Sequence, residues 1–185
     1  MIAEIQQEAS TKMQQAVDHA REDMATIRTG RAHPAMFNKI QADYYGAPTP
    51  LQQLAQFTSP DPRSLLITPF DRSAIGAIEK AIRDADLGVN PGNDGNAVRI
   101  VMPQLTEERR KEYIKMAKGK AEDARIAVRN IRRHANDQLK KLQKDGEISE
   151  DDLVRAEKAL DGTTKRFVES VDEVLKTKEA ELAEV

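Results

Sequence analysis

The sequence contains no cysteine and no tryptophan among its 185 residues. Without cysteine the chain has no disulfides, no thiolate metal ligands and no cysteine nucleophile. It also has no apolar run that approaches the ~20 residues needed to span a bilayer, so no membrane partner is expected. The first residues, Met1 to Gln7, form neither a basic nor an apolar region. We therefore expect no secretory signal and a cytoplasmic location.

Proline is absent from both ends of the chain. All eight prolines lie between Pro34 and Pro103, as do five of the seven Phe and Tyr residues. Proline interrupts helix interiors at a cost of ~3 kcal/mol, so the two flanks are free to form long helices and the middle is not. The sequence therefore predicts a helical domain made of residues 1–30 and 105–185, with residues 31–104 inserted in it.

Apolar residues recur at helical spacing in both flanks. The first stripe covers residues 2–27, and Gly30 is expected to end its helix. A second stripe, 114–142, follows Thr106 as N-cap and contains small residues that allow close helix approach. A third helix is expected after Ser149, and the short turn before it makes the last two helices antiparallel. Three such faces predict a long antiparallel three-helix bundle.

The insert has the pattern of a small, β-rich α+β domain. Four segments are predicted strands: 40–45, 54–58, 64–68 and 97–102. Residues 46–50 are interpreted as a turn, and Asp71 as the cap of a helix that ends by Gly88. Two thin connections between compact bodies are typical of a hinge. The predicted hinge residues are Thr29, Gly30, Arg31, Pro103, Gln104, Leu105 and Thr106.

The net charge of −2 conceals an uneven distribution. Residues 105–145 carry 13 basic and 7 acidic residues, whereas residues 146–185 carry 6 and 12. One exposed stripe is predicted on the second helix, with steps of seven, four and three: Lys118, Arg125, Arg129 and Arg132, with Arg133 beside it. Such a stripe is usually a solvated face that pairs with acidic neighbours. The predominance of arginine favours the alternative, an edge that binds RNA phosphates.

No pattern supports a catalytic or metal site. The three histidines, His19, His33 and His134, are scattered, and neither G-x-S-x-G nor H-E-x-x-H occurs. We therefore predict no enzyme activity, no catalytic residue, no metal and no cofactor.

Five stretches, taken together, resemble bacterial ribosome recycling factor over essentially the whole chain: 27–32, 44–51, 70–73, 105–111 and 127–133. The resemblance implies an L-shaped protein of two domains. It implies binding to large-subunit ribosomal RNA in the intersubunit space of the post-termination ribosome. It further implies that the chain, with elongation factor G and its GTP hydrolysis, dissociates the ribosome into subunits.

The resemblance also assigns individual residues. Arg129 and Arg132 match the family's RNA-contacting arginines, and Arg110, Arg28 and Arg31 match further positions near the same site.

The heptad-like seams leave a rival hypothesis open, a dimeric coiled-coil interaction or scaffold protein. Three seams in one chain can satisfy one another, which favours a monomer.

Overall fold

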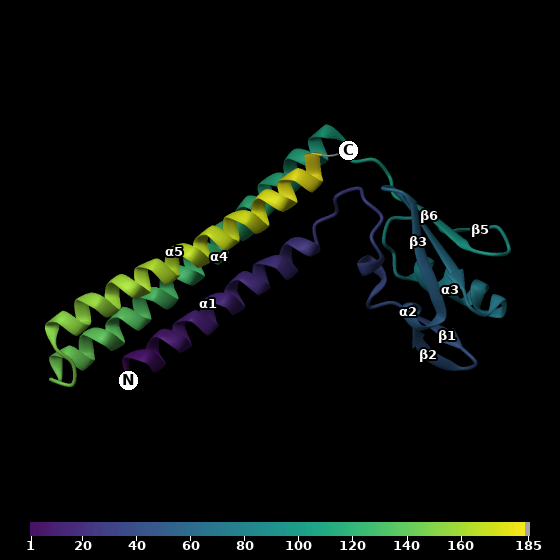
Figure 1. Ribbon diagram of the computed structural model, residues 1–185. Coiled ribbons are helices and arrows are strands. Elements are labelled where there is room, and N and C mark those ends of the chain that lie inside the picture. Colours follow the sequence, from purple (N-terminus) through teal and green to yellow (C-terminus); the bar gives the residue numbers. More distant parts are fainter. Residues whose placement is uncertain (184–185) are drawn as a thin grey trace. The chain divides into compact units, whose positions relative to one another are not determined.

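The chain folds into two compact units. A computed structural model describes residues 1–183, so the end of the predicted 105–185 segment lies outside the described residues. The units are Met1–Arg28 with Thr106–Val185, and Thr29–Leu105. The first is helical and the second combines strands with short helices (Figure 1). The predicted fold class, a three-helix bundle with an inserted α+β domain, is confirmed. None of the described helices combines the length and apolar character needed to cross a membrane.

Three long helices form the bundle: α1 (Ile2–Ala25), α4 (Glu107–Lys144) and α5 (Glu150–Ala183). Their directions follow from the residues that share a core. Ala9 of α1 packs with Leu139 and Ala156, whereas Met24 packs with Ala121 and Val171. Helix α1 is therefore antiparallel to α4 and parallel to α5.

The turn between α4 and α5 is formed as the sequence predicts. Gly146 adopts a φ of +78°, and the amide of Glu147 donates to the carbonyl of Leu142 at 2.9 Å. This left-handed termination satisfies carbonyls that the last helical turn leaves free. The hydroxyl of Ser149 then accepts from the amide of Asp152 at 3.0 Å and starts α5. The predicted N-cap of α4 is also present, since the hydroxyl of Thr106 accepts from Arg109 at 3.1 Å.

Small side chains line the seam of α4. Its buried residues are Ala117, Ala121, Ala124, Val128, Ala135 and Leu139. On α5 the buried position between Leu160 and Phe167 is polar, since Thr164 occupies it. The Thr164 hydroxyl donates to the carbonyl of Leu160 at 2.8 Å, which satisfies a polar group that would otherwise be costly to bury.

Two glycines lie in helix interiors without a packing reason. A Cβ added at Gly119 of α4 or Gly162 of α5 would meet no atom within 4 Å. Glycine in a helix interior is less favourable than alanine by roughly 0.5–1 kcal/mol, so Gly119→Ala and Gly162→Ala should each stabilise the chain by about that amount. Urea unfolding would measure the gain. A loss of stability at either site would mean that close approach of another group requires the glycine.

Helix α1 ends earlier than predicted. The sequence places its end at Gly30, but the last helical residue is Ala25 and Thr26 is the C-cap. The Thr26 hydroxyl donates to the carbonyl of Asp23 at 2.6 Å. The amides of Thr26 and Ile27 donate to the carbonyls three residues before them, those of Asp23 and Met24. Local bonding by the threonine side chain thus competes with the helical ladder.

The inserted unit contains two antiparallel sheets. Strands β1 (Gln41–Tyr44) and β2 (Ala47–Pro50) form one. The other has the order β3-β4-β6-β5, with bounds Ala55–Asp61, Ser64–Pro69, Val98–Val101 and Gly92–Asn93 respectively. The helical pieces are Pro34–Phe37, α2 (Leu51–Leu54), Arg72–Ala74 and α3 (Ile75–Asp84). Ile78 and Ile82 of α3 share a core with Leu65 of β4 and Ile100 of β6. Helix α3 therefore covers one face of the larger sheet.

The turn predicted at 46–50 is wrong, because most of it is strand β2. Tyr45 and Gly46 form the turn instead, with φ of 50° and 80°, the combination that joins hairpin strands across two residues. Pro48 and Pro50 face Asp43 and Gln41 in the ladder. Two residues apart, both prolines fall at positions that donate no ladder hydrogen bond, so the hairpin tolerates them.

A tyrosine links this hairpin to the start of α3. The Tyr44 hydroxyl donates to a carboxylate oxygen of Asp71 at 2.8 Å, which raises the pKa of Tyr44 to about 12. The carboxylate of Asp71 accepts hydrogen bonds from the backbone amide of Ser73, from the Ser73 hydroxyl and from Tyr44. These three bonds lower the pKa of Asp71. As predicted, Asp71 caps the helical turn before α3.

Both chain connections of the insert are fixed at one turn of its larger sheet. The amide of Ala32 donates to the carbonyl of Pro62 at 2.9 Å, and the amide of Met102 donates to that of Arg63 at 2.8 Å. The Arg63 guanidinium also donates to the carbonyl of Met102, at 2.9 and 3.2 Å. The segment that enters the insert and the segment that leaves it therefore lie side by side at the β3–β4 turn.

Candidate RNA-binding surface

The predicted basic stripe lies along α4, but its members differ in exposure. Seven-residue spacing places Lys118, Arg125 and Arg132 directly after the seam residues Ala117, Ala124 and Ile131. Such positions flank the apolar face, where arginine stems become covered by the neighbouring helix. Lys118, Arg129 and Arg133 are exposed, whereas Arg125 and Arg132 are half-buried. The prediction that the stripe is exposed is therefore wrong for Arg125 and Arg132.

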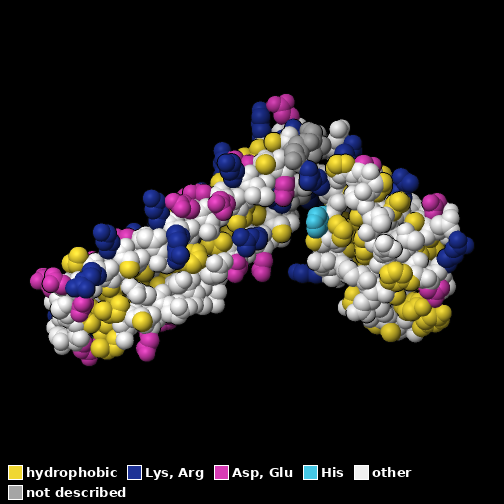
Figure 2. Space-filling model, in the orientation of Figure 1, with side chains coloured by type: hydrophobic (Ala, Val, Ile, Leu, Met, Phe, Trp, Pro, Cys, Tyr) yellow, Lys and Arg dark blue, Asp and Glu magenta, His cyan; other side chains and the backbone are white. Residues whose placement is uncertain are grey.

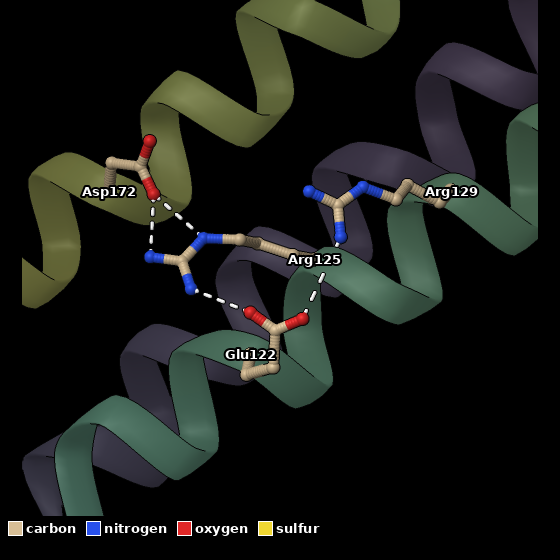
Figure 3. A network of polar contacts seen from close by, with 4 residues as sticks. All are labelled: Glu122, Arg125, Arg129 and Asp172. Atoms are coloured by element: carbon tan, nitrogen blue, oxygen red, sulfur yellow. Dashed lines mark hydrogen bonds and ion pairs between the residues drawn. The ribbon is translucent and has the colours of Figure 1, made fainter. Parts of the chain in front are cut away.

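Arg125 joins α4 to α5. Its guanidinium donates to Oδ1 of Asp172 on α5, with nitrogen–oxygen distances of 2.7 and 2.8 Å, and to Glu122 at 3.0 Å (Figure 3). Its side chain is only 19% exposed. Partial burial acts to lower the pKa of Arg125, but the bonds to Asp172 and Glu122 outweigh it and the net shift is upward. The guanidinium thus stays charged and fastened.

Removing this connection should destabilise the bundle. Arg125→Met keeps most of the apolar stem and deletes the charge-assisted bonds, so the free energy of unfolding should fall by roughly 1–2 kcal/mol. Urea unfolding would measure it, with Arg133→Met as the matched control, since Arg133 is exposed and its contact to Asn130 is long, at 3.5 Å. Equal stability of the two variants would mean that the Arg125 bonds contribute nothing.

Arg129 and Arg132 differ from Arg125 in how much bonding capacity they retain. Arg129 is 47% exposed, and its contact is Glu122 at 3.7 Å, beyond hydrogen-bond distance. The Nε of Arg132 is buried and has no hydrogen-bond partner among residues 1–183. Unlike Arg125, both side chains have terminal guanidinium nitrogens that make no hydrogen bond within residues 1–183 and can donate to a ligand.

The remaining candidates lie near the unit boundaries. Arg110 is half-buried in the first turn of α4. Arg28 and Arg31 are exposed in the segment after α1, and the boundary between the units falls between them.

Acidic side chains accompany the basic ones over the visible face of the helical unit (Figure 2). The acidic partners of the stripe are Glu122 on α4 and Asp172 on α5, which sequence reasoning did not single out. The three-residue spacing of Glu122 and Arg125 is a readable signal for a helical ion pair. Asp172 gives no such signal, since its pairing depends on the register between α4 and α5.

Comparison with known proteins identifies the family. The sequence model described as Ribosome recycling factor matches residues 20–182. The chain belongs to the ribosome recycling factor family. A ribosome-recycling factor of Cutibacterium acnes is 64% identical over 184 residues, which cover 100% of both chains. That of Streptomyces coelicolor is 62% identical over 185 residues, again with 100% coverage of both.

Solved structures of ribosome recycling factors agree with this assignment. A solution structure of the factor has a TM-score of 0.81 at 36% identity and covers 100% of this chain and 98% of its own. A second chain is 44% identical, with a TM-score of 0.68 and 98% coverage of both chains. It comes from models of the T. thermophilus ribosome recycling factor and the E. coli elongation factor G bound to the E. coli post-termination complex. The resemblance read from the sequence is confirmed.

Proposed function

We propose that this chain is a cytoplasmic translation factor that binds the post-termination ribosome and, with elongation factor G, dissociates it into subunits. The observation that carries the proposal is the match to ribosome recycling factors across the full chain. One matched relative is itself described with elongation factor G on a post-termination complex. The chain contributes no catalytic group in this proposal, because GTP hydrolysis belongs to elongation factor G.

The basic stripe of α4 is the proposed anchor on large-subunit RNA in the intersubunit space. Arg129 and Arg132 are its main contacts, because they keep free donors, and Lys118 and Arg133 add exposed positive charge. Without aromatic residues among them, these side chains suit phosphates rather than base edges. Arg125 has a different role, since its guanidinium is already bonded within the bundle.

The inserted unit is the proposed moving part, with hinges at residues 29–31 and 103–106. Between its bonded ends at Ala32 and Met102 and the helices α1 and α4, the chain has no regular secondary structure. Because both ends meet beside the same turn, rotation at two neighbouring points can reorient the unit without unfolding it.

The rival scaffold hypothesis loses its main support. The apolar faces of α1, α4 and α5 pack against one another within one chain. In the part of the chain that the structure describes, these seams need no second copy, so we propose a monomer. Sedimentation at micromolar concentration tests this, and a dimer would favour the scaffold.

The function is tested with purified post-termination complexes. Chain, elongation factor G and GTP are added together, and light scattering follows subunit separation. Separation is expected only when all three are present and the nucleotide can be hydrolysed. Ribosomes that stay intact in the full mixture would overturn the proposal.

The hinge is tested by single-molecule energy transfer. The chain has no native cysteine, so Lys80→Cys on α3 and Lys140→Cys on α4 label one exposed site in each unit. We expect the distance distribution to change when elongation factor G joins the ribosome-bound chain. An unchanged distribution during splitting would show that the insert does not move.

A further inference from the structure

Glu122 lies between two arginines of the basic stripe. Its Oε2 accepts from Arg125 at 3.0 Å, and its Oε1 is 3.7 Å from a guanidinium nitrogen of Arg129 (Figure 3). The two contacts are unequal. The first is a charge-assisted hydrogen bond, and the second is an electrostatic contact without one.

Arg125 fixes the position of this carboxylate. Because the Arg125 guanidinium is also bonded to Asp172 at 2.7 and 2.8 Å, it cannot follow Glu122 if Glu122 moves away. All three guanidinium nitrogens of Arg125 are therefore bonded, two to Asp172 and one to Glu122. The second carboxylate oxygen of Glu122 is left facing Arg129. The arrangement places a negative charge, bonded to Arg125, beside an exposed positive one.

A phosphate that binds Arg129 would meet this charge. The carboxylate is close enough to repel the phosphate across less than a Debye length, so salt screens the repulsion only in part. Glu122 also competes for Arg129 when no phosphate is present. Both effects act in the same direction, toward weaker binding.

We propose that Glu122 limits how tightly Arg129 holds RNA phosphate, which keeps ribosome binding reversible. This inference rests on the proposed anchoring of the stripe to ribosomal RNA. A factor that acts on many ribosomes in turn must leave after each one, and dissociation rates account for most affinity differences at one interface. Glu122 thus weakens binding in order to speed release.

The test uses the full chain and vacant 70S ribosomes at several KCl concentrations. Glu122→Gln keeps the shape of the side chain and removes its charge. It should lower the Kd by about three- to tenfold, mainly through slower dissociation, and steepen the salt dependence. Glu112→Gln is the matched control. Glu112 is 56% exposed and 3.6 Å from Arg109, and Glu122 is 53% exposed and 3.7 Å from Arg129.

Glu112 lies ten residues before Glu122 and seventeen before Arg129, about 15 and about 25 Å along the helix, beyond the Debye length at physiological salt. The control should therefore lower the Kd much less than Glu122→Gln does. Unchanged or weaker binding of Glu122→Gln would overturn the inference, as would an equal gain in Glu112→Gln.

A double variant separates this inference from the proposed function. Arg129→Ala should weaken ribosome binding. Adding Glu122→Gln to it should restore at most a small part of the lost affinity, because the arginine that Glu122 opposes is gone. If Arg129→Ala binds like the unaltered chain, the anchoring proposal fails. If Arg129→Ala weakens binding and Glu122→Gln alone gives no gain, anchoring stands and the role of Glu122 is wrong.

Discussion

Replacing Arg129 and Arg132 together with alanine is expected to reduce affinity for 70S ribosomes on the order of 100-fold, since a hydrogen bond to a charged group contributes roughly 1.5–3 kcal/mol. The slope of the logarithm of the binding constant against the logarithm of the salt concentration should become shallower by about one for each arginine removed. Arg129 is exposed, so its loss should leave stability unchanged. Arg132 is half-buried, and the loss of its packed stem should cost up to about 1 kcal/mol.

The matched control removes the same charge from the same helix. Lys140 and Lys141 are exposed near the end of α4 and lie outside the basic stripe. Lys140→Ala with Lys141→Ala should change ribosome affinity only slightly. Equal losses in the two double variants would mean that net charge, and not the stripe, governs binding.

Replacing Ala121 with leucine should produce the largest loss of stability considered for the bundle. Ala121 is 0% exposed and shares a core with Val17 of α1 and Val171 of α5. A larger side chain there must displace packed helices, at a cost of roughly 1–3 kcal/mol. Calorimetry should show a lower Tm, by about 2–4 °C for each kcal/mol in a chain of this size.

The same substitution at an exposed position isolates packing from helix propensity. Ala159 lies on α5 and is exposed, so Ala159→Leu should leave the Tm close to that of the unaltered chain. If the Ala121→Leu and Ala159→Leu variants have the same Tm, the seam of α4 tolerates large residues and close helix approach is not required.

The helical unit could be predicted from the sequence because its signals are local and repeated. Thr106, Ser149 and Gly146 carry start and stop signals that depend only on nearby backbone groups. The end of α1 was not predictable from Gly30, since the deciding event is a hydrogen bond of the Thr26 side chain. Strand β2 was missed because prolines at 48 and 50 signal a turn unless the ladder register is known.

The surface was less predictable than the fold. Spacing along α4 identified the basic residues, but it could not show that Arg125 bonds to Asp172, because that contact depends on the register of two helices. Flanking positions looked exposed by periodicity alone, although α5 covers part of Arg125. Which arginines are available to a ligand is therefore a tertiary property.

The fixed ends of the insert have a consequence for the order of folding. Helix α1 leaves the ribosome first during synthesis, yet its partners in α4 and α5 begin only at Glu107. The insert is contiguous and can fold before those helices exist. Proteolysis of chains stalled with α1 and the insert emerged should find strands β4 and β6 protected and α1 cleaved.

Once folded, the insert shortens the loop that must close before α1 meets α4. The bonds at Ala32 and Met102 hold its two ends together, so roughly ten flexible residues remain in place of about 80. By the logarithmic dependence on loop length this lowers the entropic cost of closure by about 2 kcal/mol. We therefore expect the folded insert to speed the packing of α1 against α4. Without that contact, α1 is an isolated and only marginally stable helix.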